Sequence, residues 1–93
     1  MTYAIDFTPA AERDVEDLPA DMRPAVGRSI AALAGDPRPP GSGRLTGTLK
    51  GSRRLRVGDY RVGYQIDEQT RAVTIWQVKH RSKFYDKARR RRR

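Results

Sequence analysis

The sequence lacks cysteine entirely, and it has a single histidine and a single tryptophan. Without cysteine, the chain can form no disulfide framework, no zinc–thiolate site and no thiolate nucleophile. Long apolar runs are absent as well, and residues 1–7 include Asp6, so the sequence shows neither a signal peptide nor a membrane span. We therefore expect a cytoplasmic protein that has no membrane partner.

The chain is also short. Its 93 residues are enough for one domain with a modest core and too few for two. Hydrophobic residues make up 37% of the sequence and charged residues 33%, so the core is expected to be small. We expect one domain over residues 1–88, followed by a basic tail at residues 89–93. A run of arginines of this kind is typical of a disordered tail that binds without specificity.

Positive charge dominates, with a formal net charge of +9, and its distribution is uneven. Residues 1–43 hold four basic and seven acidic side chains, whereas residues 44–66 hold six basic side chains and only Asp59 as an acid. Residues 79–93 add nine basic side chains against the single Asp86. An acidic first half followed by two basic segments indicates a protein that binds nucleic acid.

Residues 54–66 predict a tight β-hairpin, and much of the positive charge lies on it. Gly58 and Asp59 form its two-residue turn, with Gly58 at the position that requires a positive φ. If Val57 pairs with Tyr60, alternation places the apolar side chains on one face, toward the core. That face carries Leu55, Val57, Tyr60, Val62, Tyr64 and Ile66.

The other face of the hairpin, called the arginine face below, carries Arg54, Arg56 and Arg61. The same register places Arg56 opposite Arg61 and leaves open backbone at Gly63. Like charges directly opposite each other destabilise a sheet, so a compensating anion such as a phosphate is expected here. The alternative is that these are solvated positions on a half-buried hairpin, because alternation alone requires only polar residues there.

The residues before the hairpin predict a strand and two helices. The alternation of Tyr3, Ile5 and Phe7 predicts a short strand, and Thr8 with Pro9 then supplies a helix N-cap and first helical residue. The inner stripe of this helix is Ala11, Val15 and Leu18. Asp21 is expected to cap a second helix that has Pro24 in its first turn and ends at Gly35. Its inner stripe is Met22, Val26, Ile30 and Leu33.

Residues 36–52 are rich in proline and glycine and predict a long loop that is functional or mobile. A last strand at residues 73–78 is expected to be buried on both faces, with Val73 and Ile75 on one side and Trp76 and Val78 on the other. A short C-terminal helix is expected to begin at Phe84. The predicted fold is α+β, in the order β-α-α-β-β-β-(α), with two helices on one face of a mainly antiparallel four-stranded sheet.

The sequence from Arg54 to Tyr64, followed by Val78-Lys-His-Arg81 and then Tyr85, resembles the RelE/ParE superfamily of bacterial type II toxins. The resemblance spans residues 3–85 and includes the helical pair that precedes the hairpin. It implies a toxin held silent by a cognate antitoxin, in a toxin–antitoxin hetero-oligomer. RelE-type members cleave messenger RNA in the ribosomal A site, so the resemblance also implies mRNA and the ribosome as partners.

Carried over by position, the RelE-type catalytic set falls on Arg54, Arg56, Arg61, Arg81 and Tyr85, and His80 lies where other members carry lysine or histidine. The sequence departs from the family in having Arg53 where an aromatic residue is common. It also has arginines at positions 54 and 56, where the best-known RelE has lysines. Further RNA or ribosome contacts are expected from Lys50, Arg53, Lys79, Lys83 and Lys87.

The arginines limit the chemistry that this set can perform. Arginine stabilises a phosphate but remains protonated in proteins, so it cannot serve as a general base. Histidine is the side chain that exchanges a proton near neutral pH, and His80 is the only one present. The alternative for His80 is a strand-end residue bonded to backbone, and the alternative for Tyr85 is helix packing.

We therefore predict a RelE-like endoribonuclease that uses no metal and no organic cofactor. Two other hypotheses remain open from the sequence. The first is a ParE-like toxin that inhibits DNA gyrase on the same fold, and the second is an inactive module that binds RNA or antitoxin.

Overall fold

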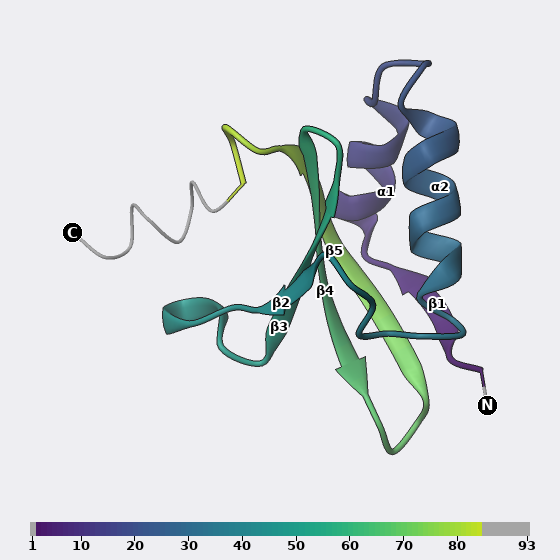
Figure 1. Ribbon diagram of the computed structural model, residues 1–93, viewed down its shortest axis with the longest axis vertical. Helices are drawn as coiled ribbons and strands as arrows, with labels where there is room; N and C mark the ends of the chain where they lie inside the picture. The colour runs from purple at the N-terminus through teal and green to yellow at the C-terminus, as the bar shows by residue number, and fades with distance from the viewer. Residues whose placement is uncertain (1, 85–93) are drawn as a thin grey trace.

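The computed structural model describes residues 2–84, which form a twisted sheet with two helices packed against one side (Figure 1). In chain order the elements are β1 (Ala4–Phe7), α1 (Pro9–Glu16), α2 (Arg23–Ala32), β2 (Ser42–Arg44), a 3₁₀ turn (Gly47–Leu49), β3 (Ser52–Val57), β4 (Tyr60–Asp67) and β5 (Ala72–His80). The sheet order is β1-β5-β4-β3-β2. β1 runs parallel to β5 and the other pairs are antiparallel. No helix within this range is long and apolar enough to cross a membrane.

The predicted α+β class is confirmed, but the sheet has five strands rather than four. The additional strand, β2, lies inside the segment that the sequence predicted to be a loop. Its three residues, Ser-Gly-Arg, carry no apolar alternation, so nothing in their side chains signals a strand. They form one because the backbone pairs with the free edge of β3, Gly43 opposite Arg54, directly after Gly41 takes a φ of 90°.

The sequence predicted the N-cap residue correctly for α1 but not for α2. The Thr8 hydroxyl accepts the Ala11 backbone N–H at 3.1 Å, so the predicted N-cap of α1 is confirmed. The predicted cap at Asp21 is wrong. Met22 occupies the N-cap position of α2 without any side-chain capping bond, and Asp21 lies within the turn that the Met22 N–H closes on the Pro19 carbonyl.

The core lies between the helices and the sheet, as the apolar stripes predicted. Its buried members from the helices and from the residues that directly follow them are Ala11, Leu18, Val26, Ile30 and Leu33. The β3–β4 hairpin adds Leu55, Val57, Val62 and Tyr64, with Tyr60 and Ile66 half-buried at the margin. Tyr64 also donates its hydroxyl to the Pro37 carbonyl at 2.7 Å, which fastens the segment after α2 to the sheet.

A bulge in β5 changes one of the predicted faces. The β4–β5 register shifts between Gly63 and Tyr64, so that Gly63 pairs with Gln77 and Tyr64 with Ile75. One extra residue in β5 reverses the alternation beyond it. Val78 therefore joins Val73 and Ile75 in the core, and the prediction that it shares a face with Trp76 is wrong.

Several predictions concern the end of the chain. The last described residues form a turn in which the N–H groups of Lys83 and Phe84 donate to the His80 carbonyl. The predicted C-terminal helix beyond Phe84, the limit at residue 88 and the tail at residues 89–93 lie outside the described residues.

Candidate functional site

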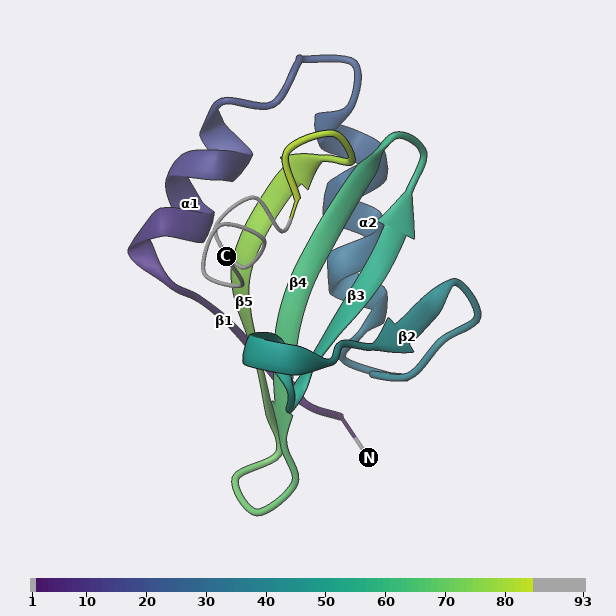
Figure 2. The same cartoon turned by 90° about the vertical axis from the view of Figure 1, so that its left-hand side faces the viewer.

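The arginine face is the side of the sheet away from both helices, toward the viewer in Figure 2. The predicted hairpin register is confirmed pair by pair, with Val57 opposite Tyr60 and Arg56 opposite Arg61. Gly58 has a φ of 58°, as the turn required. Arg61 in turn pairs with Lys79 of β5, so one row of three cations crosses β3, β4 and β5.

Arg61 lies at the centre of the positive charge on this face. Its Nη1 donates to the carbonyls of Gly58 and Tyr60, both at 3.0 Å, and these bonds hold the guanidinium near the hairpin turn. Partial burial is the largest cause of a lowered pKa for Arg61. The charges of Arg56, Arg54 and Arg81 lower that pKa further. Four arginines therefore lie close enough to repel one another, which is the electrostatic condition of an anion site.

This repulsion has little compensation from acidic side chains. The two ion pairs found within residues 2–84 are Arg38–Glu68 and Lys79–Asp14, and neither includes an arginine of the arginine face. Asp59 offsets part of the effect on Arg61. Its backbone carbonyl also accepts the Arg81 N–H at 2.7 Å, which joins the end of β5 to the hairpin turn. A bound anion would therefore supply negative charge that residues 2–84 do not place within ion-pair distance of these arginines.

Arg54 lies in the next row, between Gly43 of β2 and Gly63 of β4. A Cβ at residue 43 would stand 3.5 Å from the Arg54 Nη2, whereas one at residue 63 would meet the Trp76 ring at 2.8 to 3.0 Å. The expectation of open backbone at Gly63 is thus wrong, because the indole covers it. The Nε of Arg54 and the Nε1 of Trp76 are both buried, and neither has a hydrogen-bond partner in the described structure.

His80 lies at the end of β5 and on the other side of the sheet from Arg61. It pairs with Tyr60, whose ring faces the core side and contacts the imidazole edge-to-face at 5.5 Å. The Nδ1 atom accepts the Ser82 backbone N–H at 3.2 Å and lies 2.9 Å from the Ser82 hydroxyl. The fold therefore groups Arg81, but not the His80 imidazole, with the arginines.

The residues predicted to contact RNA are spread over several surfaces. Lys79 is on the arginine face but pairs with Asp14 of α1 at 2.9 Å. Arg53 pairs with Tyr64 and so points to the helix side of the sheet. Lys50 lies between the 3₁₀ turn and β3, and Lys83 is exposed after β5. Tyr85 and Lys87 lie outside the described residues.

Sequence reasoning missed Asp14 and Trp76. Asp14 accepts the Val78 N–H at 3.0 Å as well as the Lys79 ammonium, so it closes the edge of β5 beyond the end of β1. No sequence pattern marks this helix residue, since the contact spans 64 positions. Trp76 had one available signal, because a glycine inside a strand, here Gly63, indicates close approach of another group.

Comparison with known proteins decides the family. The family model described as the ParE toxin of the type II toxin–antitoxin system parDE matches residues 5–85. Toxin RelG of Mycobacterium tuberculosis is 35% identical over 86 residues, covering 91% of this chain and 98% of RelG. The chain belongs to the RelE/ParE superfamily of type II toxins.

Solved structures agree with this assignment of the toxin. The toxin–antitoxin complex RelBE2 of Mycobacterium tuberculosis contains a chain with a TM-score of 0.77 and 32% identity, covering 86% of this toxin and 99% of that chain. The archaeal RelE–RelB complex of Pyrococcus horikoshii gives a TM-score of 0.74 at 26% identity, covering 87% of this toxin and 97% of that chain. The superfamily and fold that the sequence predicted are both confirmed.

Proposed function

We propose that this toxin is a ribosome-dependent endoribonuclease that cleaves messenger RNA in the A site and so inhibits translation. The observation that supports it is the position of Arg61, which is held by two backbone carbonyls and surrounded by the charges of Arg54, Arg56 and Arg81. A phosphodiester bound there would relieve the mutual repulsion of these groups. Its relatives RelG and the RelE chains of the solved complexes support the RelE-type activity over other functions.

The reaction proposed is transfer of the phosphate to the neighbouring ribose hydroxyl. The 2′-oxygen attacks phosphorus, the bond to the 5′-oxygen breaks, and the products are a 2′,3′-cyclic phosphate and a 5′-hydroxyl. The 2′-hydroxyl proton is lost and the leaving 5′-oxygen gains one. Arginine side chains stabilise the pentacoordinate phosphate, because their donors are already placed when its negative charge develops. The proposal assigns this work to Arg61, with Arg54, Arg56 and Arg81 around it.

The proton transfers need other groups, because arginine retains its proton. His80 and Tyr85 remain the candidates that the resemblance supplies. His80 reaches the arginine face only if its side chain turns away from Tyr60. RNA and ribosomal groups also carry hydroxyls and amines that exchange protons. We therefore propose Tyr85 ahead of His80 as a proton carrier, because the His80 imidazole contacts Tyr60 on the other side of the sheet.

A cognate antitoxin is the proposed protein partner, and translating ribosomes place the toxin in the cytoplasm. The two solved relatives named above come from toxin–antitoxin complexes. We expect an antitoxin segment that carries acidic residues for the arginine face and apolar residues for a second surface. An apolar groove between β1, α1 and α2, where Phe7 is 38% exposed, has the chemistry to take those apolar residues.

A second candidate function is gyrase inhibition. It is favoured by the family model, which is described for ParE toxins rather than for RelE toxins. The retained basic set on the arginine face argues for the ribonuclease, since gyrase inhibition does not require a phosphate-cleaving constellation.

Primer extension on translated messenger RNA after induction tests the two functions. The ribonuclease gives cuts at defined positions within codons, in wild type but not in Arg61→Ala. Gyrase inhibition gives DNA damage with intact messenger RNA, and an inactive module gives neither. Intact messenger RNA in cells that stop growing would overturn the proposed function.

A further inference from the structure

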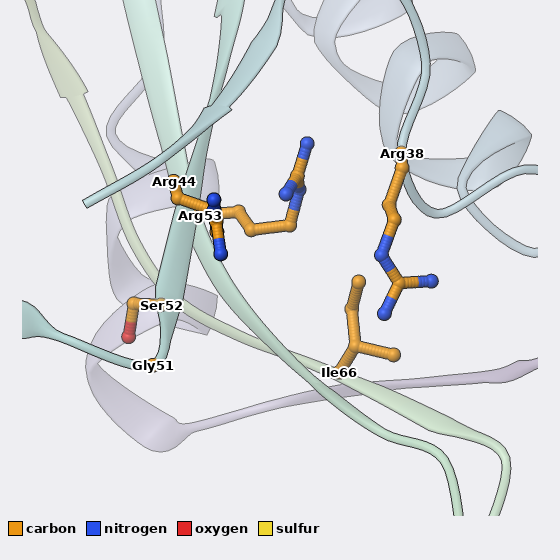
Figure 3. Close-up of a pocket in the computed structure, with 6 residues that line it drawn as sticks. All are labelled: Arg38, Arg44, Gly51, Ser52, Arg53 and Ile66. Atoms are coloured by element: carbon orange, nitrogen blue, oxygen red, sulfur yellow. The ribbon is translucent and has the colours of Figure 1, made fainter.

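A second group of arginines lies on the opposite side of the sheet from the arginine face. Arg38, Arg44 and Arg53, together called the edge arginines here, line a pocket of about 240 Å³ that Ile66 also borders (Figure 3). Arg44 and Arg53 come from β2 and β3, and Arg38 approaches from the segment after α2 on the other side of the pocket. Three successive segments of the chain thus bring three guanidinium groups to one cavity.

The pairing of the strands fixes Arg44 and Arg53 on this side. They are direct partners in the β2–β3 ladder, and Arg53 is the direct partner of buried Tyr64 in the β3–β4 ladder. Direct partners point to the same face of a sheet. Arg54, the next residue of β3, points to the arginine face. The β2–β3 ribbon therefore carries positive charge on both of its faces.

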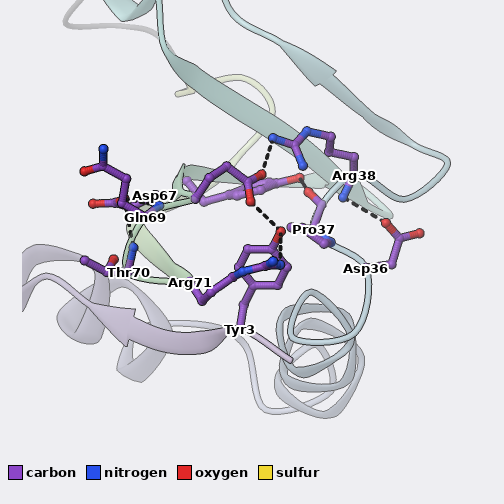
Figure 4. A network of polar contacts seen from close by, with 10 residues as sticks. Tyr3, Asp36, Pro37, Arg38, Asp67, Gln69, Thr70 and Arg71 are labelled. Carbon is purple, nitrogen blue, oxygen red and sulfur yellow. Dashed lines mark hydrogen bonds and ion pairs between the residues drawn. The ribbon is translucent and has the colours of Figure 1, made fainter. Parts of the chain in front are cut away.

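Within the described part of the chain, one acidic side chain, that of Glu68, compensates the edge arginines. Glu68 accepts from the Arg38 Nη2 at 2.8 Å and from the Tyr3 hydroxyl at 2.7 Å, which holds Arg38 beside the β4–β5 turn (Figure 4). Arg53 donates its Nη2 to the Ser42 hydroxyl at 3.0 Å, while its Nε is buried without a hydrogen-bond partner in the described structure. Residues 2–84 offer Arg44 and Arg53 no carboxylate within ion-pair distance.

These features together are those of an anion site. Like charges face each other across a ladder, which costs stability unless an anion is bound. A buried guanidinium donor is unsatisfied, which also costs stability. The opposing position of Arg38 allows an anion to be held from two sides, and guanidinium groups bind phosphate through paired donors.

We propose that the edge arginines bind a backbone phosphate of folded RNA, at a place separate from the strand that meets Arg61. This inference rests on the proposed ribosomal target. A ribbon with cations on both faces fits between two polyanionic surfaces, as a structured RNA provides. A short acidic peptide would need to wrap around the β2 edge to reach both faces. The edge arginines thus position the toxin, and the arginine face performs the reaction.

Binding to programmed ribosomes that carry a non-cleavable 2′-deoxy codon in the A site tests the proposal. Arg44→Ala is the primary variant because Arg44 is exposed and its side chain makes no hydrogen bond or ion pair within residues 2–84. Arg53→Ala is the second variant, and Arg53→Lys keeps its charge while removing the paired donors. The matched control is Arg28→Ala, which removes one charge from the exposed surface of α2.

We expect each edge variant to raise the dissociation constant for the ribosome about tenfold. The slope of the logarithm of the dissociation constant against the logarithm of the salt concentration should fall by about one. On ribosomes with a cleavable codon, at saturating concentration, the single-turnover cleavage rate and the cleavage positions of Arg44→Ala should match those of the wild type. Arg53→Lys should recover only part of the affinity. Variants that bind as tightly as the control would overturn the proposal. So would variants that bind ribosomes normally but lose affinity for the cognate antitoxin.

The binding and cleavage measurements together separate this proposal from the proposed function. If the wild-type toxin binds ribosomes through the edge arginines but cuts no messenger RNA, the ribonuclease function is refuted and the phosphate site is supported. If the wild-type toxin cuts messenger RNA and the edge variants bind as tightly as the control, only the phosphate site is refuted.

Discussion

The indole of Trp76 lies directly on the backbone of Gly63, on the same face of the sheet as Arg54 and Arg61. The bulge in β5 produces this contact by adding a residue opposite the Gly63–Tyr64 step. Phe84 stacks on the indole, with its ring centre 6.0 Å from that of Trp76. Aromatic rings therefore lie beside the charges of the arginine face, where the sequence indicated open backbone.

Gly63→Ala should destabilise the toxin, because its new Cβ would stand 2.8 Å from the indole ring. Overpacking of this kind costs roughly 1–3 kcal/mol of unfolding free energy. Urea denaturation followed by Trp76 fluorescence measures it. Gly27→Ala is the matched control, since Gly27 is inside α2 and no neighbouring group of residues 2–84 would lie within 4 Å of its new Cβ. The control should gain about 0.5–1 kcal/mol. Equal stability of the two variants would contradict the described contact.

Asp14→Ala should also destabilise the toxin, for a different reason. The Asp14 side chain is 10% exposed and accepts both the Val78 N–H and the Lys79 ammonium, so its removal leaves a strand N–H without a partner. Such a loss costs on the order of 1–3 kcal/mol. Asp14→Asn keeps an acceptor for the N–H and should lose less. Hydrogen exchange at Val78 reports the contact directly, and unchanged protection in Asp14→Ala would refute it.

Glu68 makes the stability of the toxin sensitive to acid. Its hydrogen bonds from Tyr3 and Arg38 lower its pKa in the folded state. A carboxylate with a lowered folded pKa stabilises the protein above its unfolded pKa and loses this contribution as the pH falls through the folded value. Glu68→Gln should therefore lower the melting temperature at pH 7 and have less effect near pH 3.

The control for Glu68 is Asp21→Asn, since Asp21 is exposed and caps no helix. It should leave the melting temperature unchanged at pH 7. A Glu68→Gln variant whose melting temperature follows that of wild type at every pH would show that the network contributes nothing.

His80 tests which side of the sheet meets the RNA. Because its imidazole contacts Tyr60 and the Ser82 backbone rather than the arginine cluster, His80→Ala should lower the single-turnover cleavage rate by less than about tenfold. Arg61→Ala, measured beside it on programmed ribosomes, should have the larger effect. A loss for His80→Ala as large as for Arg61→Ala would mean that the imidazole reaches the reacting phosphate.

The sequence was sufficient where local rules decide the structure. The Gly58 turn sets the hairpin register, and alternation from there places Leu55 in the core and Arg56 outside it. The Thr8 cap was predictable for the same reason, since the bond spans three residues.

The features that the sequence did not predict depend on contacts between different segments of the chain. β2 exists because β3 has a free edge, and Asp14 matters because α1 lies against the end of β5. The bulge that moves Val78 into the core leaves no mark in an apolar strand. The division of Arg53 and Arg54 between two faces follows from alternation, but the cavity that Arg53 enters requires Arg38 from another segment.

The central claim is that the arginine face carries out cleavage, and single-turnover cleavage on programmed ribosomes tests it most directly. Arg61→Ala should reduce the rate by about a hundredfold to a thousandfold while the fold is retained, since Arg61 lies outside the core and its loss relieves repulsion with Arg56. A truncation that removes residues 90–93 should weaken binding to the ribosome and reduce the salt dependence of that binding. The cleavage positions and the cleavage rate at saturating ribosomes should not change. If the truncation abolishes cleavage and Arg61→Ala retains it, the arginine face is not the active site.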